Sequence, residues 1–240
     1  MEGYLAKVQA LLTEVEIKET ETIQKVIEEI SNRIQRGGIV QLFGCGHSHL
    51  LAEEPYYRAG GLVPVKPIAV EPLMLHNGAV QSSVNEKDPD FSSSFLHSLD
   101  IRKEDAVIVI STSGRNPVPI DVALAARNHN AFVVGLLSLA YKDQPSKHFS
   151  GKRLEDVVTV TVDNHVPVGD AILSREGVAQ SFGPASSVIG SAILHTIFSG
   201  VIDTLHKEGV TPPIFLSGNI DGSSQHNEEL IQKYRHRIDF

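Results

Sequence analysis

Residues 39–54, IVQLFGCGHSHLLAEE, decide which fold we expect of this chain. An apolar run ends at Gly44, and a helical pattern begins within the next six residues. Gly44 and Gly46 permit positive φ angles and a close approach of the backbone to a ligand. Ser48 falls where the helix starts. Two roles are open for its hydroxyl: it caps the helix, or it holds an anion together with the free amides of the first turn.

The same alternation of apolar run and helix recurs along the chain. Apolar runs of strand length lie at 39–43, 63–70, 106–110, 132–137 and 157–162, and helical patterns lie near 48–60, 89–99, 118–129, 185–207 and 225–235. Runs such as AVIVI are continuously apolar, which is typical of strands buried on both faces. The pattern predicts an α/β fold with a doubly wound parallel sheet of five strands. Ligands of such sheets bind beyond the carboxyl ends of the strands.

A second polar loop, STSGRNP at 111–117, follows the third predicted strand. Three hydroxyls precede a helix whose first turn contains proline, and Arg115 adds a fixed positive charge. Hydroxyl donors and exposed amides at the start of a helix suit a phosphate group. The alternative is a Ser/Thr-rich turn with a solvated arginine. Because two such loops follow neighbouring strands, we favour anion binding.

Composition limits the possible partners. The formal net charge of −8 opposes binding to nucleic acid, and the 6% aromatic residues include no tryptophan. The only cysteine, Cys45, cannot form an internal disulfide, which fits a reducing cytosol. No stretch reaches about eighteen uninterrupted apolar residues, and the N-terminal segment is amphipathic rather than a signal peptide. We therefore expect a cytoplasmic protein without a membrane span or a nucleic-acid partner.

The motifs FGCGHSH and VIVISTSG resemble those of the SIS (sugar isomerase) family of phosphosugar-binding domains. The likeness covers roughly residues 35–207, and it implies a flavodoxin-like strand order, a small phosphosugar ligand and no cofactor. It implies one SIS domain over 1–240, with an N-terminal helical extension (1–36), a core (37–207) and a C-terminal tail containing a helix (208–240). The predicted phosphosugar-binding residues are Gly46, Ser48, Ser111, Thr112, Ser113, Gly114, Arg115, Asn116 and Ser186.

Three longer stretches, GHSHLLAEEPYYRAGGLVP, STSGRNPVPIDVA and FGPASSVIGSAIL, more closely resemble a bacterial SIS subgroup related to phosphoheptose isomerases. The chain departs from the family pattern at two positions. Asn116 stands where many members have a hydroxyl, and Arg58 stands where several isomerases have a glutamate. Glu54 lies four residues before Arg58, on nearly the same helix face.

Isomerisation of an aldose to a ketose needs a base near carbon and a second group that relays hydroxyl protons. Of the adjacent Glu53 and Glu54, we favour Glu54 as the residue that faces the site; the alternative is a solvated acidic face. His195 lies in the last long helix, where related isomerases have a catalytic histidine, and the alternative is a hydrogen-bonded core histidine. We therefore predict Glu54 and His195 as the catalytic residues.

Other polar groups are weaker candidates, and for each turn chemistry is equally plausible. His47 and His49 lack a third partner, so we predict no metal site. The polar tail at 217–227 has no mechanism that we can derive. The remaining candidates are Glu71 and His76 after the second strand, and Asp163, Asn164 and His165 after the last.

Two classes of function fit these residues. The first is a sugar-phosphate isomerase, or a lyase or etherase that uses the same proton abstraction. The second is a regulatory module that binds a phosphosugar without converting it.

Residues 4–35 form a long amphipathic helix whose apolar stripe must be buried. The family resemblance implies a homodimer or homotetramer, so we expect a second chain to bury this helix; the alternative is that it folds back on its own domain.

Overall fold

The computed structural model describes residues 3–240. Its central sheet is parallel and five-stranded, with the order β2-β1-β3-β4-β5. This flavodoxin-like order confirms the predicted fold class. The strands are β1 (Val40–Gly44), β2 (Val65–Pro67), β3 (Ala106–Ile110), β4 (Phe132–Leu137) and β5 (Val160–Asp163).

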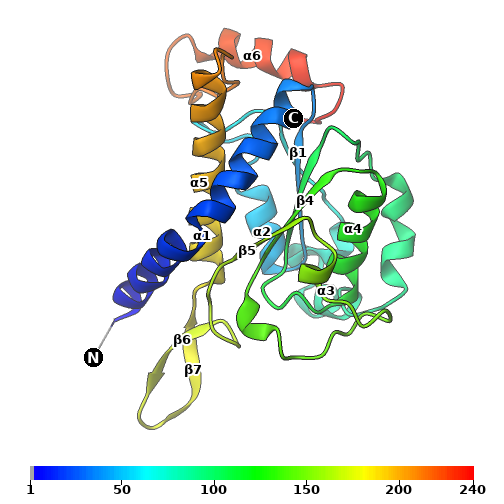
Figure 1. The fold of residues 1–240 in the computed structure, drawn as a ribbon, viewed down its shortest axis with the longest axis vertical. Coiled ribbons are helices and arrows are strands. Elements are labelled where there is room, and N and C mark those ends of the chain that lie inside the picture. Colours follow the sequence, from blue (N-terminus) through cyan, green and yellow to red (C-terminus); the bar gives the residue numbers. More distant parts are fainter. Residues whose placement is uncertain (1–2) are drawn as a thin grey trace.

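Helices flank this sheet, and a two-stranded antiparallel hairpin projects from it (Figure 1). The helices of the described part are α1 (Tyr4–Gln35), α2 (His47–Glu53), α3 (Ala79–Asn85), α4 (Pro117–Asn128), α5 (Ser186–Lys207) and α6 (Ser223–Tyr234). The hairpin strands are β6 (Ala171–Arg175) and β7 (Val178–Pro184). Short 3-10 turns cover Glu71–Leu73, Leu75–Asn77, Phe91–Ser94, Leu96–Ser98, Leu139–Tyr141 and Leu154–Asp156.

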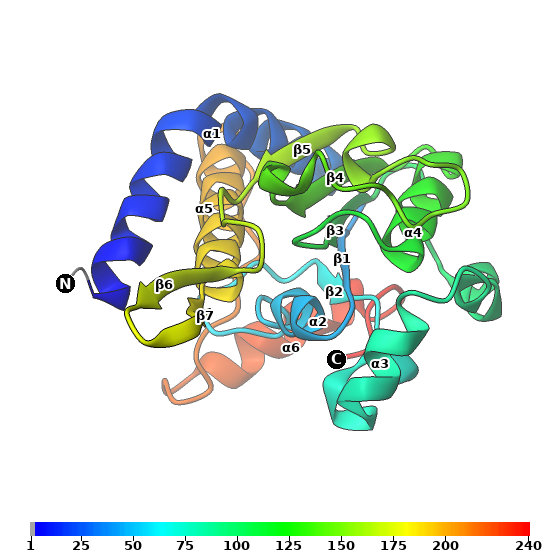
Figure 2. The ribbon, with the colours of Figure 1, turned by 90° about the horizontal axis from the view of Figure 1, so that it is seen from below.

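The sheet is buried on both faces, which explains its continuously apolar strands. In β3, Ala106, Ile108 and Ile110 pack with α1, α2 and α5, whereas Val107 and Val109 pack with α4 and the neighbouring turns. Figure 2 shows these two helical layers on opposite sides of the sheet. α6 and the C-terminal segment form a third, smaller cluster with the start of β1.

α1 packs against α5 of its own chain, which corrects the expectation that a second chain buries it (Figure 1). Val26 and Ile30 of α1 are fully buried in the core beneath it. α5 is long and apolar enough to cross a membrane by length and composition alone, yet here it is a core helix between α1 and the sheet. Leu5 and Ile17 of α1 stay exposed.

Sequence periodicity misplaces two segments. The expected helix at 89–99 consists of two 3-10 turns, and a short α-helix, α3, lies earlier at 79–85. The β6–β7 hairpin was not predicted, because most of its residues are exposed and lack a sustained alternation. Of these elements, α3 and the end of β7 lie near the predicted ligand loops.

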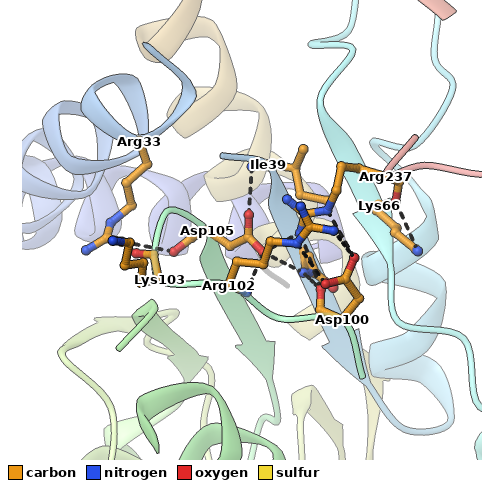
Figure 3. Close-up of polar contacts among 9 residues, drawn as sticks. Arg33, Ile39, Lys66, Asp100, Arg102, Lys103, Asp105 and Arg237 are labelled. Carbon is orange, nitrogen blue, oxygen red and sulfur yellow. Dashed lines mark hydrogen bonds and ion pairs between the residues drawn. The ribbon is translucent and has the colours of Figure 1, made fainter. Parts of the chain in front are cut away.

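The opposite edge of the sheet is held by a buried ion pair (Figure 3). The carboxylate of Asp105, which has no exposed surface, accepts a hydrogen bond from Nη2 of Arg237 at 2.7 Å. It also accepts bonds from the Ile39 amide, the Gln41 side chain and the Arg102 amide. One carboxylate thus joins the starts of β1 and β3 to the C-terminal segment.

We predict that Arg237→Met lowers the free energy of unfolding by about 3–5 kcal/mol, because it leaves the buried charge of Asp105 without its ion-pair partner. Urea denaturation followed by circular dichroism measures the change. Arg235→Met is the matched control, since the side chain of this exposed arginine bonds only to Gln232 among the described residues. We expect a change within about 0.5 kcal/mol. Equal stability of Arg237→Met and wild type would contradict the role given to the pair.

Candidate functional site

A cavity of about 660 Å³ opens at the carboxyl ends of β1 and β3. The position agrees with the rule that ligands of doubly wound sheets bind at this edge. The structure brings most of the predicted binding residues to its wall: Gly46, Ser48, Ser111, Thr112, Ser113, Asn116 and Ser186 all line it.

The first loop depends on the small size of Gly44, the last residue of β1. A Cβ atom at this position would lie 2.4 Å from the backbone oxygen of Ser48. Only glycine therefore lets α2 start directly over the end of the strand. This contact brings Ser48 to the cavity wall, and its hydroxyl makes no hydrogen bond within the described residues.

The second loop, residues 111–114, is braced from behind. Nη2 of Arg153 donates to the backbone oxygen of Ser113 at 2.6 Å, and the Leu154 amide donates to the oxygen of Gly114 at 2.8 Å. Gly114 has a φ of +60°, and a Cβ there would lie 3.0 Å from a carboxylate oxygen of Glu155. The fixed loop carries unused donors. In the part of the chain that the structure describes, the hydroxyls of Ser111, Thr112 and Ser113 and the amides of Thr112 and Ser113 have no hydrogen-bond partner.

Arg115 does not face the cavity. Its Nη1 donates to Oε1 of Gln144 at 2.7 Å, and its backbone oxygen accepts from the Lys147 amide. The guanidinium therefore holds the β4–β5 connection against the loop. Gly114 is likewise a loop-shaping residue rather than part of the cavity wall. The predicted positive charge at the phosphate position is absent from this arrangement.

Ser186 reaches the cavity but is already engaged. Its amide and hydroxyl donate to the carboxylate of Asp170 at 2.7 and 2.6 Å, and the Ala185 amide donates to the same group at 3.0 Å. Asp170 thus occupies the N-terminus of α5 as an acidic cap. A phosphate at that helix start would have to displace this carboxylate.

Asn116, at the end of the second loop, holds a carboxylate that the sequence did not reveal. Its Nδ2 donates to Oε1 of Glu86 at 2.9 Å, and both residues line the cavity. Because a carboxylate only accepts, this bond fixes the orientation of the Asn116 amide. Glu86 follows α3, whose position is fixed by bonds from Ser82 to the Leu73 oxygen and from Asn85 to the Pro72 oxygen.

The predicted catalytic residues meet one another, but outside this cavity. Nε2 of His195 lies 2.7 Å from Oε2 of Glu54, and Nη1 of Arg58 lies 2.7 Å from Oε1 of the same glutamate. His195 remains 41% exposed, so it is neither a core histidine nor enclosed in a site of this chain. Glu53 points elsewhere and pairs with the buried His49 at 3.1 Å. Neither glutamate lines the cavity, so the expectation that Glu54 faces the ligand site does not hold within one chain.

The remaining candidates lie away from the cavity. Glu71 and His76 are exposed on the 3-10 turns after β2. Asp163 and His165 form a separate polar cluster with Glu19 of α1, in which Nε2 of His165 lies 3.0 Å from the glutamate. Asn164 caps the local turn by accepting from the Val166 amide. These contacts are those of turns and helix packing.

Several cavity residues had no signal in the sequence. Glu86, Asp170 and Tyr141 lie far from the two serine loops along the chain and reach the cavity from α3 and from the connections around β5. The sequence does not show whether an acidic residue in a polar connection is buried, or which way its side chain points. Only the rule that ligand sites lie at the carboxyl edge draws attention to these connections.

The sequence of this chain matches a known protein family. A model of the SIS domain family matches residues 3–138, more than half of the chain. The chain belongs to the SIS domain family. It is 52% identical to a UPF0309 protein of Geobacillus thermodenitrificans over 239 residues, which cover 99% of this chain and 96% of that protein. The family assignment made from the two serine-containing loops is thus confirmed.

The solved structures with this fold include a phosphoheptose isomerase and a NanR protein. Phosphoheptose isomerase GmhA from Neisseria gonorrhoeae matches with a TM-score of 0.55 at 16% identity, covering 83% of this chain and 95% of that chain. The Vibrio vulnificus NanR protein complexed with ManNAc-6P matches with a TM-score of 0.52 at 13% identity, covering 95% of this chain and 67% of that chain. At such low identities the likeness concerns the fold.

The single cysteine of this SIS domain, Cys45, lines the cavity. Burial, and to a smaller extent the negative charge of Glu86, raise the pKa of Cys45 well above its ordinary value. The thiolate is the nucleophilic form, so this residue is poorly suited to nucleophilic catalysis. Its role in the fold is that of a small apolar side chain in the core beside α4.

We predict that the raised pKa of Cys45 makes the fold less stable at alkaline pH. Above the ordinary thiol pKa of about 8.5, the unfolded chain has lost this proton and the folded chain keeps it, so the free energy of unfolding falls as pH rises, by up to about 1.4 kcal/mol per pH unit. Urea denaturation between about pH 8.5 and 9.5 measures the slope. Cys45→Ala should show a shallower slope than wild type; identical slopes would contradict the assignment.

Proposed function

We propose that this protein binds a phosphosugar, with the phosphate group at the loop of residues 111–113. One observation carries the proposal: the unused hydroxyls of Ser48, Ser111, Thr112 and Ser113 converge on one cavity at the start of α4. Hydroxyls and free amides at a helix N-terminus provide the donors that a phosphate needs. The rest of the 660 Å³ cavity has room for the sugar.

The comparisons support the same ligand class. The NanR structure is described as a complex with ManNAc-6P, a sugar phosphate, and the GmhA structure is that of a phosphoheptose isomerase. Both have the fold seen here. We therefore propose a sugar-phosphate isomerase that moves a proton between adjacent carbons by general acid/base catalysis. A lyase or etherase would start from the same proton abstraction.

A binding module without catalysis is the second candidate. The observation that favours it is the position of Glu54 and His195, which pair with each other and do not line the cavity of their own chain. Turnover separates the two functions. An isomerase exchanges solvent deuterium into the carbon next to the carbonyl of its substrate, whereas a binding module is stabilised by the sugar and leaves it unlabelled.

The phosphate position predicts the effect of a double substitution. Ser111→Ala with Ser113→Ala removes two hydrogen bonds to a charged group, so the affinity for a phosphosugar should fall at least about 100-fold. Isothermal titration calorimetry measures this, with ligands chosen by a thermal-shift screen of sugar phosphates. Ser93→Ala with Ser94→Ala is the control, because within the described residues these hydroxyls bond to the backbone oxygens of Asp90 and Phe91 in their own 3-10 turn and do not line the cavity. Undiminished affinity in the first variant would remove the phosphate from this loop.

A catalytic role for Glu54 and His195 requires a second copy of the chain, in agreement with the homodimer or homotetramer that the SIS resemblance implies. We propose that the pair of one protomer completes the cavity of another. Glu54→Gln should then lower kcat by about 10²–10⁴-fold while binding persists, and Glu53→Gln should not.

Mixing two inactive variants tests this arrangement directly. After unfolding and refolding together, Glu54→Gln protein and Ser111→Ala/Ser113→Ala protein should recover about a quarter of wild-type turnover, because half of the dimers are mixed and each mixed dimer has one intact site. Light scattering establishes the mass of the assembly. A monomer mass of 26.1 kDa, or no recovery from a proven dimer, contradicts the shared site.

A further inference from the structure

The charges around the cavity are unusual for a site that takes a phosphate. Among the described residues that line it there is no lysine and no arginine, since Arg115 turns away to Gln144. Two carboxylates, Glu86 and Asp170, lie in the wall instead. The protein as a whole also has a net charge of −8. A phosphate dianion on a neutral sugar would meet two carboxylates, and the imidazole of His47 is the one group in the described wall that could carry a positive charge.

The two carboxylates differ in whether an oxygen remains free to accept a hydrogen bond from a ligand. Both oxygens of Asp170 are engaged by the first turn of α5, through the Ala185 and Ser186 amides and the Ser186 hydroxyl. Glu86 accepts one bond, from Asn116 to Oε1, and its Oε2 has no hydrogen-bond partner in residues 3–240. Glu86 is therefore the carboxylate that remains available to a ligand.

The carboxylate of Glu86 is held in place by Asn116. Asn116, nine-tenths buried, is the N-cap residue of α4, yet its side chain makes no cap and reaches Glu86 instead. The same residue ends the loop that we assign to the phosphate. The hydrogen bond from Asn116 thus holds the Glu86 carboxylate beside the end of that loop.

Resting on the proposed phosphosugar site, we propose that its ligand is an amino-sugar phosphate with a free amine, and that Glu86 binds the ammonium group. Such a ligand places its phosphate on the hydroxyls of the serine loop and its cation on the unused oxygen of Glu86. The charge-assisted bond satisfies Glu86 and offsets the repulsion between that carboxylate and the phosphate. An N-acetyl sugar offers only a neutral amide donor, and its methyl group adds an apolar surface beside the charge.

Calorimetry with matched ligands tests the proposal on the full chain. For each of the gluco, galacto and manno series, the hexosamine 6-phosphate, its N-acetyl form and the corresponding hexose 6-phosphate are titrated at neutral pH. In at least one series the amine should bind about tenfold or more tightly than both other forms, as expected for one charge-assisted hydrogen bond. Glu86→Gln should abolish that preference, and it should raise rather than lower the affinity for the hexose 6-phosphate, because the carboxylate that repels the phosphate is gone. Glu104→Gln, at the opposite edge of the sheet, should leave the preference unchanged.

The outcomes separate this proposal from the one on which it rests. If hexose phosphates and amines bind equally in every series, the amine proposal is overturned while phosphosugar binding stands. If the N-acetyl form binds most tightly, the role of Glu86 is likewise overturned. If no sugar phosphate binds, both proposals fail. The comparison of ligands on wild-type protein decides the matter even where Glu86→Gln does not fold.

Discussion

The buried ion pair between Asp105 and Arg237 is the constraint on which the arrangement of the sheet depends. A carboxylate without exposed surface is tolerated only when every one of its interactions with water is replaced, and here two backbone amides and two side chains do so. The donors come from the start of β1, from the turn before β3 and from the C-terminal segment. Fixing the amino ends of β1 and β3 in this way also fixes the register in which their carboxyl ends, and the two serine loops, stand side by side.

The opposite ends of the sheet use polar groups in contrasting ways. At the amino end, the oxygens of Asp105 are saturated, and Arg237 is almost fully buried. At the carboxyl end, the hydroxyls of Ser111, Thr112 and Ser113 line the cavity and have no hydrogen-bond partner among residues 3–240. A saturated network stabilises a fold, whereas donors that face a cavity without a protein partner are available to a ligand. This contrast is the physical reason for assigning a binding role to one edge and a structural role to the other.

The sequence was sufficient for features that depend on local pattern. β3 and β4 begin and end where their apolar runs do, because continuous burial leaves no polar residue inside them. The serine loops were predictable because hydroxyls and glycines after two neighbouring strands have few purely structural uses. Features that depend on tertiary contacts were not accessible. The side chain of Arg115 hydrogen-bonds to Gln144, twenty-nine positions along the chain, and therefore points away from the cavity. The hydroxyl of Ser186 hydrogen-bonds to Asp170, and the two residues are separated in sequence by a hairpin that periodicity does not predict.

The amphipathic pattern of α1 predicts that one face of the helix is buried, but it does not predict which element buries that face. Its stripe packs on α5 of the same chain, yet Leu5 and Ile17 remain exposed, and an apolar groove lined by Leu12, Ile23 and Ala192 separates parts of the two helices. The contact between α1 and α5 therefore does not argue against an oligomer. The argument for an oligomer now depends on the position of Glu54 and His195 rather than on α1. Glu54 and His195 lie 2.7 Å apart, are partly exposed and do not line the cavity of their own chain. A role in the chemistry of a bound sugar would therefore need a second protomer, whose cavity this pair completes, as we propose.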